Sequence, residues 1–462
     1  MAKKIKHSES TVSLPLEIVS SFFPVQPDAN VSPLVKISDV LQNQGISKSH
    51  LCEAIAILIG IMSSRWGDPV PMIITEDEGA GAVELLHTCL NLVPDNSWID
   101  ITTGKKASAG SDRFEGKTVI SYEAETAKDL FSWLLSEIEL RNKLTQTRGQ
   151  SISRGPSSPS FVVITKNPNN PLLQNRYVTR IHISADQESN RERLKNLAKK
   201  SDLTLLRQHK VESACLRTLF DRIKALPVDI EFADQIINEN AINIENIVPY
   251  YDSALRLLRN IARINAYPPL RSEELEAAFI GLDLEDLIED EEINKREPLK
   301  ATKIDYHYFL SIFGGMFKIE NHFITPRQFR IYHAIINHNI GYRRKYKQYD
   351  KLSDQQLLDN IHESAFSKAW ITRIEIVEIL KTDGSELISS TSLHNELQEL
   401  LKLKLITERK VPHRKNKSAY AATQVIEDAS LFDVHPSAIE DSIFKKSSVE
   451  VKDIVTLETV KI

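Results

Sequence analysis

Residues 70–94, VPMIITEDEGAGAVELLHTCLNLVP, constrain the fold of this chain more than any other stretch. The apolar run over 70–74 predicts a buried strand, which leads into a loop with two glycines, Gly79 and Gly81. The amphipathic run that follows predicts a helix. Strand, glycine loop and helix in this order are typical of a phosphate-binding P-loop, whose pattern is G-x-x-x-x-G-K-[ST].

The residues that give a P-loop its chemistry are replaced. With Gly81 taken as the last glycine, the first glycine is Glu76, the lysine is Ala82 and the Ser/Thr is Val83. Asp77 and Glu78 add two more carboxylates to the loop. One like-charge contact at about 4 Å costs roughly 4 kcal/mol at an effective dielectric constant near 20, so we expect that ATP does not bind in the usual pose. The alternative is a plain acidic surface turn.

Composition sets broad limits on the protein. The chain has 462 residues, which corresponds to about three domains, and a net charge of −5 that gives no global nucleic-acid signature. Three distant cysteines without a CxxC pair predict neither disulfides nor a metal site. The first residues lack a signal-peptide pattern, and the apolar run over 54–62 is about half a membrane span. We therefore expect a cytoplasmic protein without membrane association.

Three further apolar strands are expected, each beside a polar residue suited to a nucleotide site. The run that ends in Tyr122 and Glu123 has a Walker B layout, with Tyr122 at the metal position and the water-polarising Glu123 retained. The strand in 160–168 ends in Asn167, and Arg176 precedes the strand in 177–184. We predict a parallel α/β sheet, with Thr75 and these side chains clustered at the carboxyl ends of its strands.

Residues 50–280 resemble the AAA+ helicase-like ATPases that mobile elements carry beside zinc-finger DNA primases. The resemblance rests on EAIAILIGIMSSRWGDPVPMIITEDEGAGAVELLHTCLNLVP, KTVISYEAE, FVVITKN, NRYVTRIHIS, LLRQHKVESACLRTLF and YYDSALRLLRNIARINAYPPL. It implies a P-loop α/β domain with a helical lid, and a hexamer-forming ATPase that moves or remodels DNA. It also implies that Arg176 is the subunit-interface arginine, with Arg180 less suited to that role. The missing lysine, Ser/Thr and first Walker B acid argue against hydrolysis.

The carboxy-terminal third changes character. We expect the helix that begins at Pro326 to end at Gly341, before a basic–aromatic cluster. Cations interleaved with rings suit contact with phosphates and bases, which makes the following residues candidates for DNA binding: Arg343, Arg344, Lys345 and Lys347.

Residues 371–426 read as a winged helix-turn-helix, a short helix followed by an amphipathic helix and a basic hairpin. We predict that the second helix presents four polar side chains to base edges: Ser390, Ser392, His394 and Asn395. Five cations would hold phosphates: Arg409, Lys410, Arg414, Lys415 and Lys417. Winged helices also bind proteins, and this basic hairpin favours DNA.

The expected division of the chain follows from these patterns. It comprises an amino-terminal tail (1–46), an AAA+-like α/β domain (47–200), a helical lid (201–280), an acidic linker (281–300), a helical basic–aromatic region (301–370), the winged helix (371–426) and a carboxy-terminal tail (427–462).

The leading hypothesis is a non-hydrolysing AAA+-like protein that binds DNA in mobile-element replication or maintenance, and that assembles with itself or with a catalytic helicase or primase relative. No cofactor is expected. One alternative is a sequence-specific winged-helix transcriptional regulator. The other is a DNA-dependent ATPase or helicase that uses ATP and magnesium at a non-standard site.

Overall fold

Five parallel strands form the centre of the amino-terminal half of the protein. They are β1 (Met72–Glu76), β2 (Trp98–Asp100), β3 (Thr118–Ser121), β4 (Ser160–Ile164) and β5 (Thr179–Ile183), in the order β2-β3-β4-β1-β5. Every residue of β3 and β4 is buried, as expected for a parallel sheet that is covered on both faces. The predicted parallel α/β sheet is confirmed, with one short strand, β2, that the sequence analysis did not include.

The computed structural model describes most but not all of the chain. Described are residues 32–101, 114–124, 130–137, 159–167, 170–175, 177–185, 203–236, 248–266, 298–317, 326–349, 351–363, 367–382, 389–412, 414, 417–425, 432, 434–440, 450–454 and 459–461.

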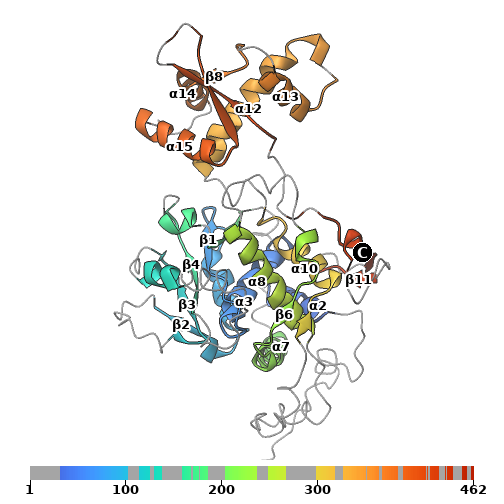
Figure 1. Ribbon diagram of the computed structural model, residues 1–462. Helices are drawn as coiled ribbons and strands as arrows, with labels where there is room; N and C mark the ends of the chain where they lie inside the picture. The colour runs from blue at the N-terminus through green and yellow to red at the C-terminus, as the bar shows by residue number, and fades with distance from the viewer. Residues whose placement is uncertain are drawn as a thin grey trace, which may run out of the picture.

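Helices cover the sheet (Figure 1). α3 (Leu51–Ser63) and α4 (Ala82–Leu90) pack on the strands, and a further layer packs against α3 or against its own members: α2 (Pro33–Asn43), α7 (Leu203–Arg222), α8 (Val248–Asn265) and α10 (Lys303–Phe313). α3 is buried almost all round because it packs against β4 on one side and against α2, α8 and α10 on others. A Cβ on Gly60 of α3 would lie 2.3 Å from the sulfur of Met72 in β1, so a larger residue here would force the Met72 side chain to move.

α2 lies in the stretch that the sequence analysis assigned to a tail. Its side chains Leu34, Val35 and Leu41 are fully buried, and Ser32 caps the helix by accepting the N–H of Leu34. The signal was present in the sequence, because Ser32 followed by Pro33 places an N-cap residue directly before a proline at the first helical position.

A buried ionic cluster fastens α8 to the segment before β1. The Asp68 carboxylate lies 2.5 Å from a nitrogen of Arg263 and 3.5 Å from one of Arg259. Arg263 also donates to the backbone carbonyl of Leu226, and the side-chain amide of Asn260 donates to the carbonyl of Asp68. These bonds satisfy charges that would otherwise be costly to bury.

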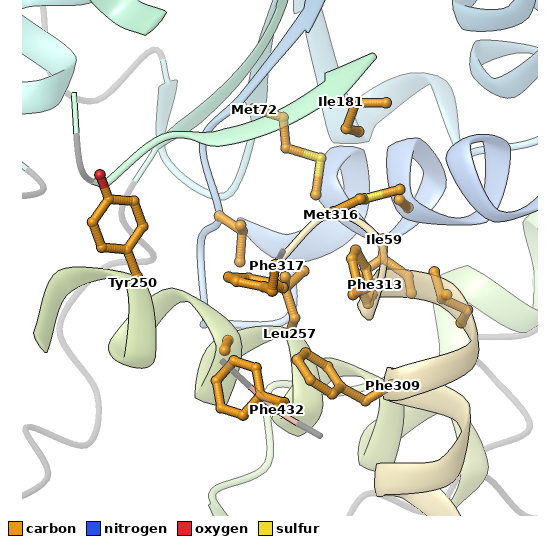
Figure 2. Packing of buried hydrophobic residues seen from close by; sticks show 14 of the residues in the cluster. Ile59, Met72, Ile181, Tyr250, Leu257, Phe309, Phe313, Met316, Phe317 and Phe432 are labelled. Carbon is orange, nitrogen blue, oxygen red and sulfur yellow. The ribbon is translucent and has the colours of Figure 1, made fainter. Parts of the chain in front are cut away.

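Phe432, near the carboxy-terminal end of the chain, is buried in the core. The ring of Phe432 lies 5.3 Å from that of Phe309 in α10 and 5.6 Å from that of Phe317, and it stacks on Tyr251 of α8 at 6.1 Å. Figure 2 shows Phe432 beside Phe309, Phe317 and Leu257. Further on, the carbonyl of Lys452 in β11 (Glu450–Lys452) accepts from the Tyr308 hydroxyl, and β11 pairs with β12 (Thr459–Lys461). Parts of the expected tail are therefore packed against α8 and α10.

The elements between residues 326 and 425 gather around a small antiparallel sheet of order β8-β10-β9 (Figure 1). They are α12 (Pro326–Arg344), α13 (Asp354–Glu363), β8 (Ile371–Thr372), α14 (Arg373–Thr382), α15 (Ser390–Lys402), β9 (Ile406–Lys410) and β10 (Ser418–Ala422). α12 packs against α13, α14, α15 and β10. We call residues 326–425 the carboxy-terminal module.

Two local expectations in this module were wrong. α12 does not end at Gly341 but continues to Arg344, because an internal glycine costs a helix only about 1 kcal/mol and the tertiary packing of α12 outweighs it. The short helix expected to open the winged helix-turn-helix does not begin at residue 371, since Ile371 pairs with Tyr420 as part of β8 before α14 begins.

Candidate functional site

The glycine loop between β1 and α4 has the backbone form of an anion-binding loop. Gly79 and Gly81 have φ angles of +80° and +88°, a backbone conformation that residues other than glycine rarely adopt. Gly81 is the N-cap of α4, and its side chain offers no capping group. Ala82, at the lysine position, is fully buried, and Val83, at the Ser/Thr position, is 42% exposed.

The anion position of this loop is taken by the chain's own carboxylate. One oxygen of Glu76, Oε2, accepts hydrogen bonds from the backbone N–H of Gly81 at 3.1 Å and of Ala82 at 2.8 Å. The first N–H groups of a helix have no partner within the helix and favour negative charge, which is why phosphates bind there. Glu76 therefore occupies the place that the motif normally offers to a phosphate.

The three carboxylates of the loop have different environments. Whereas Glu76 turns inward, Asp77 faces β5, where its Oδ1 lies 3.3 Å from His182 Nε2 and its Oδ2 accepts from the N–H of Ala185. His182 Nδ1 in turn lies 3.0 Å from the Thr75 hydroxyl. Glu78 is exposed. All three were expected to repel a nucleotide. Glu76 and Asp77 instead have partners within the protein, which hold the loop in place.

The polar residues after β3 and β4 reach the same edge of the sheet as Thr75. Parallel pairing of β4 with both β1 and β3 brings the carboxyl ends of the three strands together. Glu123 is exposed, and its backbone N–H donates to the Ser121 hydroxyl in a tight turn. Asn167 is also exposed, and its N–H donates to the hydroxyl of Thr165. Burial, and then the charge of Asp100, raises the pKa of Tyr122 at the former metal position.

The segment that precedes β5 lies at the other edge of the sheet. Arg176 lies outside the described residues, but its neighbours Asn175 and Tyr177 precede β5, and the N–H of Thr179 donates to the carbonyl of Pro71 just before β1. In a parallel sheet this is the amino end of the strand, opposite Thr75, so the described part of the expected cluster comprises Thr75, Glu123 and Asn167. Arg180, within β5, is largely removed from solvent, and burial lowers its pKa.

α15 presents a polar face as predicted, with one exception. Ser389 caps the helix by accepting the N–H of Ser392, while Leu393, Leu397 and Leu400 point into the core. The predicted residues Ser390, His394 and Asn395 are exposed, but the Ser392 hydroxyl accepts from Arg327 of α12 at 3.3 Å and faces the module interior. Thr391 is exposed one helical turn before Asn395, a position that helical spacing alone would have found.

The hairpin cations divide into structural and exposed groups. Arg409 is half-buried, with its guanidinium 4.7 Å from the Trp370 ring centre and a 2.8 Å hydrogen bond to the carbonyl of His362. It fastens α13 to β9, and its role as a phosphate contact stays a prediction. Exposed are Lys410, Arg414 and Lys417, whereas Lys415 lies outside the described residues.

The cluster at the end of α12 divides in the same way. Arg343 is 8% exposed and lies over the Tyr349 ring at 5.4 Å, so it supports the fold, and its role in DNA binding stays a prediction. Arg344 is exposed but forms an ion pair with Asp354. Lys345 is exposed, 5.9 Å from the centre of the Tyr342 ring. The side chain of Lys347 lies outside the described residues.

Comparisons with known proteins add little to this geometry. No protein-family model matches the chain, and no curated protein matches it. Among solved structures, the crystal structure of Cdc6p from Pyrobaculum aerophilum is similar over 83% of this chain and 91% of that chain, with 13% identity and a TM-score of 0.19. A TM-score this low carries no argument about fold or function.

Two kinds of feature, a membrane-spanning helix and a metal-binding cluster, are absent from the described residues. Within the ranges given above, no helix is both long and apolar enough to cross a membrane. In the same part of the chain, no group of three or more His, Cys, Asp or Glu side chains is placed to hold a metal ion.

Proposed function

We propose that this protein is a non-hydrolysing AAA+-like DNA-binding protein. The observation that carries the proposal is the Glu76 carboxylate, which occupies the helix N-terminus where a nucleotide phosphate would bind. The order of the parallel strands and the glycine loop support an AAA+-like core, and the loss of the lysine, Ser/Thr and first Walker B acid supports the absence of hydrolysis.

The carboxy-terminal module is the proposed DNA-binding part, a winged helix-turn-helix. Its support is the succession of α14, α15 and the β9–β10 hairpin, together with the exposed polar face of α15. His394 and Asn395 would meet base edges in the major groove, and Lys410, Arg414 and Lys417 would hold phosphates. The α/β part would then assemble with itself or with a catalytic helicase or primase relative during mobile-element replication or maintenance.

Titration of a fluorescent ATP analogue into the purified protein, with and without magnesium, tests the nucleotide part of this proposal. We expect no saturable binding up to millimolar nucleotide. A dissociation constant in the micromolar range would contradict it and favour the ATPase alternative. In that case magnesium-dependent hydrolysis should disappear in Glu123→Gln, the residue that would polarise water.

A sequence-specific regulator is the second candidate, and the polar face of α15 favours it. The imidazole of His394 and the amide of Asn395 suit direct readout of bases, which a protein that only tethers DNA does not need. Footprinting on the DNA around its own gene separates the two. A regulator protects one defined, often two-fold symmetric site, whereas a replication adaptor protects no such operator.

A further inference from the structure

We propose that the end of α12 forms a second nucleic-acid site that takes a single strand, separate from the face of α15. The site consists of Tyr342, Lys345, Tyr346 and Lys368, which we call the tyrosine patch. The proposal deepens the proposed function and rests on it, because it adds a single-strand site to a module proposed to bind duplex DNA.

The patch offers an exposed ring that its neighbours hold in place. Tyr346 is 47% exposed, one of few large apolar side chains of the described residues that are so open. Its ring contacts Tyr342 at 5.9 Å and Tyr349 at 6.5 Å, both edge-on, and its hydroxyl lies 3.2 Å from that of Tyr342. A ring that is fixed at its edges and open to solvent is pre-organised for stacking on a base.

Two cations accompany the rings. Lys345 lies over the Tyr342 ring at 5.9 Å, and Lys368 is exposed. The carboxylate of Asp354 does not neutralise them, because it pairs with Arg344. Rings together with uncompensated positive charge fit a strand that carries both bases and phosphates better than they fit an apolar protein partner.

Lys368 joins the patch through the chain segment that leads into β8. His338 Nε2 lies 3.1 Å from the carbonyl of Lys368, and the Asn339 amide donates to the carbonyl of Ala369 at 2.6 Å. These bonds hold the segment along the last turns of α12. Trp370, two residues further, lies under Arg409 of β9, so the base of the hairpin is adjacent to this segment.

The patch and the polar face of α15 lie at opposite ends of α12. The beginning of α15 contacts Arg327, at the start of α12, through Ser392, whereas Tyr342 lies in the last turn. The helical rise of 1.5 Å per residue separates positions 327 and 342 by roughly 22 Å. A duplex on α15 therefore leaves the patch available to another strand.

Fluorescence anisotropy of labelled 12-nucleotide dT and U strands, and of a labelled duplex, tests the assignment on the full-length protein. We expect Tyr346→Ala to weaken single-strand binding by about 5- to 150-fold, since one stacked base contributes about 1–3 kcal/mol, and to leave duplex binding unchanged. Tyr346→Phe keeps the ring and should bind as wild type. Lys368→Gln should lower the salt dependence of single-strand binding by about 0.7 in log–log slope, whereas Lys381→Gln, which removes an exposed lysine from α14, should not.

The outcomes separate the two proposals. If Tyr346→Ala binds single strands as well as wild type does, the tyrosine patch is not the site, although the proposed DNA-binding function stands. If Tyr346→Phe is as weak as Tyr346→Ala, stacking is refuted, because the ring is retained. If the wild-type protein binds neither duplex nor single strands, the proposed function and the patch both fail.

Discussion

At the scale of single residues, Glu76 determines whether the N–H groups at the start of α4 are available to an anion. A glycine at this position would leave the N–H groups of Gly81 and Ala82 open to a phosphate, whereas the carboxylate satisfies both. The sequence shows that an acid replaces the glycine. It does not show that the acid turns inward, because the direction of a side chain depends on the loop that it helps to close.

Substitution of Glu76 should therefore destabilise the fold. Glu76→Ala removes the acceptor for two helix N-terminal N–H groups, and the loss of such a cap costs about 0.5–2 kcal/mol in the free energy of unfolding. Urea denaturation followed by circular dichroism measures it. Glu78→Ala, which alters an exposed carboxylate of the same loop, is the matched control and should leave the midpoint within error. Equal effects of the two variants would contradict the assigned role.

Asp68 should make stability depend on pH. Burial tends to raise the pKa of this carboxyl, but Arg263, Arg259 and Arg256 outweigh burial and hold it below the ordinary value. A lowered pKa in the folded state means that the carboxylate stabilises the fold above about pH 4, its unfolded value, and that this contribution is lost as pH falls through the folded pKa.

Asp68→Asn tests this prediction. It leaves the buried Arg263 uncompensated, so we expect a loss of about 3–5 kcal/mol at pH 7 and a flatter dependence of the urea midpoint on pH below 4. Asp221→Asn removes the partner of Arg65 at a more exposed ion pair, and should cost less than about 1 kcal/mol. An unchanged acid dependence in Asp68→Asn would show that other carboxyls set it.

At the scale of elements, α15 and the hairpin should have different roles in DNA binding. His394→Ala and Asn395→Ala remove groups suited to base edges, so each should weaken binding to a preferred site by about 1–3 kcal/mol with little effect on random duplex. Lys410→Gln and Lys417→Gln should instead weaken binding to all sequences and lower its salt dependence. Arg409→Gln should lower the melting temperature, because Arg409 fastens α13 to β9. Electrophoretic mobility shifts and thermal melts distinguish these patterns.

The sequence predicted those elements whose hydrophobic pattern extends over several consecutive residues. The apolar strands predicted the parallel sheet, and the amphipathic helix expected in the winged helix-turn-helix is α15, whose Leu393, Leu397 and Leu400 are buried. β2 and β8 were missed because strands of two or three residues carry no measurable alternation. The ring contacts of Arg343 and Arg409 could not be predicted, because Tyr349 and Trp370 become their neighbours only through tertiary packing.

At the scale of the whole molecule, the chain leaves the α/β part after α10, forms the carboxy-terminal module, and returns to α8 and α10 through Phe432. A single phenylalanine in an acidic stretch has no periodicity, so the sequence could not show this return. Phe432→Ala should cost about 3–5 kcal/mol, typical of a buried phenylalanine, in unfolding of the α/β part. Val434→Ala, at a partly buried neighbour, is the control and should cost clearly less. Equal losses would refute an anchoring role for Phe432.

The most direct test of the central claim is a titration of labelled DNA with the full-length protein, with and without ATP and magnesium. If the loop is closed by Glu76 and the module binds DNA, the dissociation constant at about 100 mM salt should be the same in both conditions. Binding that appears or tightens only with ATP and magnesium would mean that the loop accepts a nucleotide. Absence of DNA binding in either condition would contradict the proposed function itself.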